Sequence, residues 1–334
     1  MIKIYSNKSE INENQWKNLC NESPLSNFFQ TQDCFEFYDT LSFLEPFIFG
    51  VSEDNVLKGI IVGYIIAEGN LVKRYFSRRA IIPGGILLDN NITDEALNEL
   101  LKFTRIEISS KSIYIELRNY NDYSKFKTIF ENNGFKYQAH LNFHISTPDI
   151  ETVTKKLSST KRRDIKISIR ENVQWYDSKS IDDLKAYYLL LSDLYKTKIK
   201  SPLFAFEFFE KIINFPFSKF FVIKYNEKVI GGSICVLLNN KTVFEWFVCG
   251  LDGKYKNVYP STLATWAAIE FAANNGFKLF DMMGAGKPDE GYGVREFKAK
   301  FGGELVEHGR FLYLCKPTLY SIGKYVISKL KNKK

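Results

Sequence analysis

Cysteine and histidine are scarce in this sequence. The chain has 5 cysteines and 3 histidines among 334 residues, and no two cysteines form a CxxC pattern. Zinc ribbons and dithiol redox sites need such spacings, so the sequence excludes them. The scattered, odd-numbered cysteines fit a reducing cytoplasm. His140, His144 and His308 stand alone in the sequence, and we expect structural roles for them and no bound metal.

Long apolar runs and nucleotide-binding loops are also missing. No apolar stretch reaches the roughly 18–20 residues that span a bilayer. The opening Met-Ile-Lys-Ile-Tyr lacks the charged and apolar regions of a secretion signal. The glycines of 284–293 form neither GxGxxG nor a phosphate-loop GKT/S sequence, so neither nucleotide cradle is expected. We expect a cytoplasmic protein, with peripheral contact at the inner face of the membrane as an open alternative.

The composition that is present indicates packed domains and a basic surface. Hydrophobic residues make up 45% of the chain and aromatic residues 16%, which is ample for two domain cores. The net charge of +8 points to nucleic acid, anionic lipid or a phosphorylated substrate as a partner. A basic soluble protein from a lysine-rich genome explains the same charge equally well.

The second half of the chain repeats the order of elements of the first half. The hairpin pattern of 55–66 recurs at 226–237, and the strand at 112–117 recurs at 277–282, at a nearly constant offset. This repeat predicts an α/β fold of two tandem modules, each with a mixed central sheet flanked by helices.

We place the two predicted domains at 1–148 and 149–315, because Thr147-Pro148-Asp149 interrupts the pattern. A helical pair at 181–214 has no counterpart in the first half, so we expect an insertion there. Residues 316–334 alternate apolar and basic groups at helical spacing. This basic amphipathic tail either lies on an anionic membrane surface or packs on the domain.

One late stretch, 277–304, combines a strand, a glycine-rich loop and a short basic helix. Val294, Phe297 and Phe301 form the predicted core-facing stripe of that helix. Arg295 and Lys298 then project away from the core, where they could stabilise an oxyanion or a leaving phosphate. Surface charge on an amphipathic helix is the simpler interpretation of the same pattern.

Two carboxylates on neighbouring predicted strands are candidates for proton transfer. Asp281 ends a strand beside the glycine loop, where it would orient a substrate amine, take its proton, or only cap the loop. Glu245 stands between Phe244 and Trp246 and alternates to the other face of its strand. It is a general base if that face lines a cleft, and we favour a solvent-facing position.

A second basic helix is predicted at 160–170. Ser158 or Ser159 caps it, and Ile165, Ile169 and Val173 form its buried stripe. The opposite face carries five cations, which either bind phosphates or form a solvated outer face: Lys161, Arg162, Arg163, Lys166 and Arg170.

Three stretches of the second half resemble the Fem (FemABX) family of cell-wall aminoacyltransferases. Thr160-Lys-Arg-Arg-Asp-Ile-Lys resembles the family's "TRRNIRKA" helix. Residues 259–281 resemble its helix-to-strand "LLWEAIRYAKEKGFKRFDFGG" pattern. Residues 293–304, GVREFKAKFGGE, resemble its "GVYRFKRGFGGE" pattern. In the first half, Pro83-Gly-Gly-Ile-Leu-Leu-Asp89 resembles "PRGPVLD" more weakly.

The resemblance implies two tandem GNAT-like domains and a set of site residues. The family's catalytic lysine falls on Lys298 and its first-half aspartate on Asp89. With Asp281 as the second catalytic residue, we expect substrate contacts from Lys161, Arg163, Asp89, Tyr259, Tyr292 and Arg295.

The sequence departs from the family pattern in three places. Gly84 and Ile86 stand where the family has arginine and proline, and the helices of 181–214 are shorter than the coiled-coil tRNA arm of some members. Residues 253–259 lack the Q/RxxGxG/A pyrophosphate loop of ordinary acetyltransferases, which disfavours acetyl-CoA.

The expected function is therefore a Fem-type N-acyltransferase that acts on an amine of a nucleotide- or lipid-linked peptidoglycan precursor. Aminoacyl-tRNA is the expected donor co-substrate, with no bound cofactor and no stable protein partner. An acyl-CoA-dependent N-acyltransferase that modifies an amino sugar of a surface polysaccharide is the nearest alternative. A non-catalytic protein that binds RNA or anionic membrane is the alternative of a different class.

Overall fold

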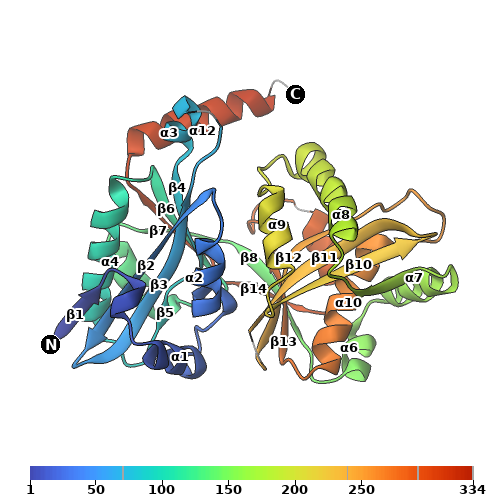
Figure 1. The fold of residues 1–334 in the computed structure, drawn as a ribbon, viewed down its shortest axis with the longest axis horizontal. Helices are drawn as coiled ribbons and strands as arrows, with labels where there is room; N and C mark the ends of the chain where they lie inside the picture. The colour runs from blue at the N-terminus through green and yellow to red at the C-terminus, as the bar shows by residue number, and fades with distance from the viewer. Residues whose placement is uncertain (70, 239, 292, 333–334) are drawn as a thin grey trace. The chain divides into compact units, whose positions relative to one another are not determined.

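The computed structural model describes residues 1–69, 71–238, 240–291 and 293–332, which fold as two α/β units. Unit 1 comprises Met1–His140 and Glu307–Lys334, and unit 2 comprises Leu141–Val306 (Figure 1). The elements of unit 1 are β1 (Ile2–Tyr5), η1 (Lys8–Glu10), α1 (Glu13–Glu22), η2 (Phe28–Gln30), α2 (Gln32–Asp39), β2 (Leu44–Glu53), β3 (Val56–Ile66), α3 (Leu71–Ser77), β4 (Arg79–Gly84), β5 (Leu87–Leu88), α4 (Asp94–Ser109), β6 (Tyr114–Asn119), η3 (Ser124–Phe126), α5 (Lys127–Asn132), β7 (Lys136–Gln138), β15 (Arg310–Leu314) and α12 (Pro317–Asn332).

Unit 2 repeats this succession. Its elements are β8 (Leu141–Ser146), α6 (Ile150–Lys156), α7 (Ser159–Arg170), β9 (Gln174–Asp177), α8 (Ile181–Leu194), the π-helical turn η4 (Tyr195–Ile199), α9 (Phe206–Ile212), β10 (Ser218–Tyr225), β11 (Lys228–Leu238), β12 (Thr242–Gly250), α10 (Pro260–Asn274), β13 (Leu279–Gly284), α11 (Gly293–Ala299) and β14 (Glu304–Glu307).

A tight β-hairpin begins the repeated part of each unit. The β2–β3 turn is made by Asp54 and Asn55, and the β10–β11 turn by Asn226 and Glu227. All four residues have positive φ, between 49° and 64°, as a two-residue type I′ turn requires. The right-handed twist of the strands favours this turn, so both predicted hairpins form as the sequence indicates.

Both sheets are mixed, as predicted. In unit 1 the strand order is β1-β2-β3-β4-β6-β15-β7, with β5 paired to β3, and in unit 2 it is β14-β8-β13-β12-β11-β10-β9. A parallel pair, β4–β6 or β12–β13, lies in the middle of each sheet, and the pairs on either side of it are antiparallel. A crossover helix joins each parallel pair, α4 in unit 1 and α10 in unit 2 (Figure 1). The predicted α/β class with flanking helices is confirmed.

The predicted domain boundaries differ from the units that form. Two strands precede the predicted boundary at 148: β7 pairs with β15, and β8 pairs with β13. Unit 1 therefore ends its first segment at His140, and residues 307–314, predicted in the second domain, supply β15 to its sheet. An apolar strand pattern shows that a segment pairs but does not identify its partner.

The helical pair of 181–214 is part of the repeat and not an insertion. α8 and α9 precede β10 just as α1 and α2 precede β2, and α8 packs on β11 and β12.

Candidate active site in the second unit

The two central strands of unit 2 separate soon after they begin to pair. The parallel register of β12 and β13 covers only Thr242–Phe244 against Leu279–Asp281. Beyond it, β12 continues to Gly250 and β13 ends at Gly284. Carbonyl groups at the end of β13 therefore need donors other than a strand partner.

Lys298 of α11 supplies those donors. Its Nζ donates to the carbonyl oxygens of Met282, Met283 (3.4 Å) and Gly284 (2.9 Å), and the side chain is buried. The prediction that Lys298 projects away from the core is wrong, because α11 instead exposes Val294, which is 43% accessible. The need to satisfy the end of β13 outweighs the apolar periodicity of this short helix.

Asp281 is buried in β13 and holds the turn that follows it. Its Oδ1 accepts a hydrogen bond from the Met283 amide at 2.6 Å, where the backbone has a φ of +57°. Its Oδ2 lies 3.4 Å from Nε2 of His144 on the neighbouring strand β8. The two predicted uses of Asp281, loop capping and a place in the site, are thus both compatible with its position.

Glu245 is buried, although the sequence favoured a solvent-facing position for it. It is only 4% exposed, and within the described residues its Oε1 has no hydrogen-bond partner. β12 is a central strand with helices on both faces, so neither face meets solvent. The uninterrupted apolar run around Glu245, from Val243 to Cys249, was the signal of this burial.

Burial and neighbouring charge set the protonation of this group. Burial raises the pKa of Glu245 to about 7, the Lys298 ammonium lowers it and Asp281 raises it. Burial lowers the pKa of Lys298, while Glu245 and Asp281 raise it. The Glu245 carboxylate can therefore accept a proton near neutral pH, and the Lys298 ammonium can stabilise negative charge in the same place.

Lys161 lies on the other side of α11 and is also buried. Its Nζ donates to Thr262 Oγ1 at 2.7 Å and lies 3.7 Å from the ring centroid of Phe297. Burial lowers the pKa of Lys161 to about 8, although Asp164 and Asp252 raise it. The buried stripe predicted for α7 is confirmed at Ile165 and Val173 and wrong at Ile169, which is 47% exposed, and the side chain of Lys161 points inward.

Arg163 remains accessible beside that buried group. Its side chain is 61% exposed and contacts Asp164 Oδ1 at 3.0 Å, and this carboxylate raises the pKa of the guanidinium. Tyr259 is half-buried at the start of α10, and its amide donates to Ser168 Oγ at 3.1 Å. α7 and α10 thus bring Lys161, Arg163 and Tyr259 to one edge of unit 2.

The other predicted site residues have contacts of their own. Arg295 donates to the carbonyls of 285, 287, 288 and 290, so it fastens the glycine-rich loop. Asp89 belongs to unit 1, where it accepts from the Asn91 amide at 2.7 Å and lies 3.3 Å from Lys58 Nζ. Tyr292 lies outside the described residues.

A carboxylate occupies the beginning of α10. Asp252 Oδ1 accepts a hydrogen bond from the Ser261 amide at 3.1 Å. Pro260 is the first residue of the helix and has no backbone N–H to donate. The helix N-terminus, where a pyrophosphate would find free amides and a favourable dipole, therefore already holds a negative charge.

The described residues contain no group of three or more histidine, cysteine or acidic side chains that could hold a metal ion. Nor does any helix in that part of the chain have the length and apolarity needed to cross a bilayer.

Known structures share this fold. The crystal structure of FemX matches with a TM-score of 0.71 at 13% identity, over 93% of this chain and 98% of that one. A tandem GNAT protein from the clavulanic acid biosynthesis pathway has a TM-score of 0.59 at 8% identity, over 94% and 99%. The C-terminal domain (DUF2156) of a proposed lysylphosphatidylglycerol synthetase from Agrobacterium fabrum has 0.58 at 12%, over 94% and 95%.

At these low identities the TM-scores establish likeness of fold alone, and they confirm the predicted pair of GNAT-like modules. No curated protein sequence matches the chain. The FemAB family model matches residues 85–328, well over half of the chain, which is therefore an acyltransferase that belongs to the FemAB family.

Proposed function

We propose that this acyltransferase moves an aminoacyl group from an aminoacyl-tRNA ester to an amine of a nucleotide- or lipid-linked cell-envelope precursor. The observation that carries the proposal is Glu245, a buried carboxyl with a pKa of about 7 beside the Lys298 ammonium. Membership of the FemAB family and the likeness to FemX support the class of reaction.

In the proposed step the amine nitrogen attacks the ester carbonyl carbon. The nitrogen–carbon bond forms, the carbonyl becomes an oxyanion, and the amine proton passes to the Glu245 carboxylate. When the oxyanion collapses, the carbon–oxygen bond to the ribose breaks, and protonated Glu245 returns the proton to the leaving oxygen. The products are an amide and the free tRNA hydroxyl.

Lys298 is the proposed electrostatic stabiliser of that oxyanion. Its three N–H groups contact backbone carbonyls, and the contact with Met283, at 3.4 Å, is long for a hydrogen bond. A charged oxyanion is a stronger acceptor than a neutral carbonyl, so it would displace this contact first. Asp281 would keep the Met283 turn in place while that exchange occurs.

The outer residues have separate proposed roles. Arg163, exposed at the edge of unit 2, and Tyr259 remain the proposed contacts for phosphates of the precursor. Lys161 donates to Thr262 Oγ1 and its ammonium lies over the Phe297 ring, so we propose that it supports α11 and does not contact the substrate. Arg295 would stabilise the loop, and contacts from Asp89 and Tyr292 remain proposals from the family resemblance.

An acyl-CoA donor is the second candidate because a tandem GNAT protein shares the fold. The Asp252 carboxylate at the start of α10 disfavours it by repelling a pyrophosphate there. A mass-shift assay with charged tRNA and with acyl-CoA, each offered to the same amine acceptors, separates the donors. Turnover with acyl-CoA alone would refute the tRNA proposal.

The location of the reaction is also a proposal. We place the protein in the cytoplasm, with α12 as a peripheral contact at the inner face of the membrane. Within α12, Ile322 and Tyr325 are 52% and 63% exposed. Co-sedimentation with vesicles containing anionic lipid, for the full chain and for a chain ending at residue 316, tests the contact. Equal binding of the two would refute it.

A further inference from the structure

Two arginines face each other on adjacent strands of unit 1. Arg118 of β6 and Arg310 of β15 are directly opposite in the antiparallel register. Like charges at such positions repel, so a neighbour must hold the pair together. The side chains lie on the face of β6 that is turned away from α4, because Ile115 and Leu117 point into the core with that helix.

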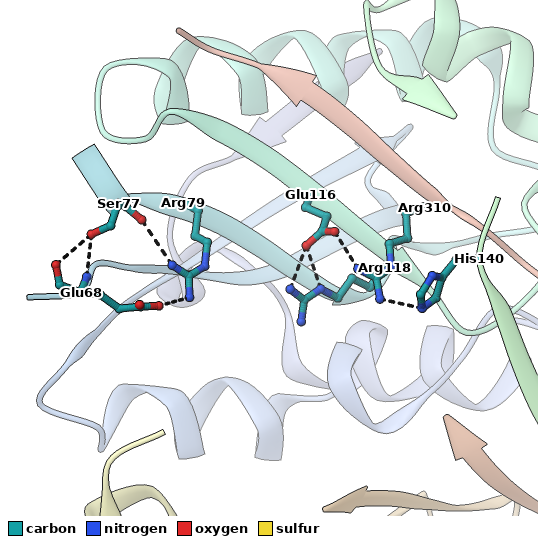
Figure 2. Close-up of polar contacts among 7 residues, drawn as sticks. All are labelled: Glu68, Ser77, Arg79, Glu116, Arg118, His140 and Arg310. Atoms are coloured by element: carbon teal, nitrogen blue, oxygen red, sulfur yellow. Dashed lines mark hydrogen bonds and ion pairs between the residues drawn. The ribbon is translucent and has the colours of Figure 1, made fainter. Parts of the chain in front are cut away.

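Glu116 bridges the two arginines. Its Oε2 accepts from Arg118 Nε at 2.9 Å and Nη2 at 2.8 Å, and its Oε1 accepts from Arg310 Nη1 at 2.8 Å (Figure 2). Burial raises the pKa of Glu116, but Arg118 and then Arg310 outweigh it and lower the pKa to about 2. The Glu116 carboxylate is therefore ionised at neutral pH.

One negative charge cannot balance two guanidinium groups. His140 lies with its Nε2 2.8 Å from Arg310 Nη2; a guanidinium can only donate, so this ring nitrogen accepts and adds no negative charge. Arg79 on β4, the next cation along this face, is paired with Glu68 (Figure 2). The cluster formed by Glu116, Arg118, His140 and Arg310 thus carries a surplus positive charge.

That surplus is accessible to a ligand. The Arg118 and Arg310 side chains are 34% and 27% exposed, whereas Glu116 is 14% exposed. Partly buried charge is costly unless it is neutralised, and guanidinium groups bind planar pairs of oxygens with two parallel hydrogen bonds. The Glu116 carboxylate orients both guanidinium groups and leaves some N–H donors of each for a second acceptor.

We propose that the Glu116–Arg118–His140–Arg310 cluster is a binding site for an oxyanion group, a phosphate or a carboxylate, of a ligand held by unit 1. The ligand would contribute the second negative charge that the two arginines lack. The site does not depend on Glu245 or Lys298, so this proposal and the proposed transfer reaction stand or fall separately.

Isothermal titration calorimetry of the full chain with inorganic phosphate and, separately, with malonate tests the site at constant ionic strength in potassium chloride. Saturable binding of phosphate alone assigns a phosphate group, and binding of malonate alone or of both assigns a carboxylate or a general oxyanion site. We expect Arg118→Gln and Arg310→Gln each to weaken binding by about tenfold or more. Arg79→Gln, on the same face but outside the cluster, should leave affinity within about twofold of wild type.

Glu116→Gln separates binding from a mere loss of folding. It removes the competing carboxylate and keeps both arginines, so the same anion should bind about tenfold more tightly and raise the melting temperature more than it does for wild type. Absence of saturable binding in the wild type would overturn the proposal. So would binding that Arg118→Gln leaves unchanged, or Glu116→Gln binding that is weaker than wild type.

Discussion

Burial and a neighbouring charge have opposite effects on the pKa of Glu245. A carboxyl in an apolar strand is more stable protonated, yet the adjacent ammonium stabilises its charged form. Its pKa of about 7 means that it gains or loses a proton near physiological pH. This is the property required of a general base, and it makes two separate measurements informative.

The first measurement is the pH dependence of turnover. The Glu245 carboxylate must be unprotonated to accept the amine proton, so kcat/KM should rise with pH and level off above about 7. Glu245→Gln should lower kcat about 100-fold or more and abolish the rise of kcat/KM with pH. Glu210→Gln, an exposed glutamate of α9, is the matched control and should behave as wild type. An unchanged rise of kcat/KM with pH in Glu245→Gln would exclude Glu245 as the base.

The second measurement is stability against pH. The folded-state pKa of Glu245 is above the ordinary 4.5, so the folded protein binds the proton more tightly than the unfolded chain between pH 4.5 and about 7. Stability should fall as pH rises through that window, by on the order of 3 kcal/mol for this group. Urea unfolding of wild type and Glu245→Gln measures the difference, which should be largest above pH 7. A pH-independent difference would contradict the raised pKa.

The pH dependence of stability that Lys161 contributes has the opposite sign. Its folded-state pKa, about 8, is below the ordinary 10.5, so the burial penalty is fully present below pH 8 and is relieved as pH rises toward 10.5. Relative to Lys161→Met, wild type should therefore gain melting temperature between pH 8 and 10. Lys166→Met is the control, since Lys166 is exposed on the same helix. Lys166→Met keeps Lys161 and should show the same gain as wild type. A gain in Lys161→Met as large as that of wild type would show that Lys161 is solvated.

At the scale of elements, α11 is held in place by the glycine turn that ends it. Gly302 has a φ of +81°, and a Cβ there would overlap the Lys156 carbonyl oxygen at the end of α6. Gly302→Ala should therefore destabilise unit 2 by more than about 2 kcal/mol and reduce turnover, because Lys298 moves with α11. Chemical unfolding and a turnover assay measure the two effects.

Gly276→Ala is the matched control for that turn. Gly276 also has a positive φ, +74°, but nothing lies within 4 Å of a Cβ there. It should cost only the left-handed backbone penalty of about 1 kcal/mol and leave turnover unchanged. Equal costs for the two substitutions would mean that the contact with α6 does not position α11.

The sequence predicts elements better than it predicts their partners. The hairpins, the crossover helices α4 and α10 and the strand-loop-helix order around Asp281 follow from local patterns. The inward direction of Lys161 and Lys298 does not, because each satisfies groups distant in the chain, the Thr262 hydroxyl and the carbonyls of β13. The burial of Glu245 was readable, since a central strand lacks alternation.

At the scale of the whole chain, each unit's sheet takes a strand from beyond the predicted boundary. β15 follows the second half in sequence but pairs between β6 and β7 of unit 1. β8 precedes the second half but pairs between β13 and β14 of unit 2. Neither unit can therefore complete its sheet until the chain beyond that boundary is present.

This pairing predicts how truncation acts. A chain ending at residue 306 lacks β15, so β6 gains an open edge, and Phe130 loses the stacked ring of Phe311 at a centroid distance of 4.3 Å. Loss of that buried ring alone costs about 3–5 kcal/mol, so unit 1 should unfold at lower urea while unit 2 keeps its transition. Hydrogen exchange at the amides of β6 measures the effect directly.

A chain ending at residue 316 is the control, because it removes only α12 and keeps β15. Its β6 amides should stay protected, and Phe311→Ala in the full chain should reproduce part of the loss seen in the shorter truncation. Protected β6 amides in the chain ending at 306 would show that unit 1 closes its sheet without β15. In that case the boundary predicted near residue 148 would be the better description of how the chain folds.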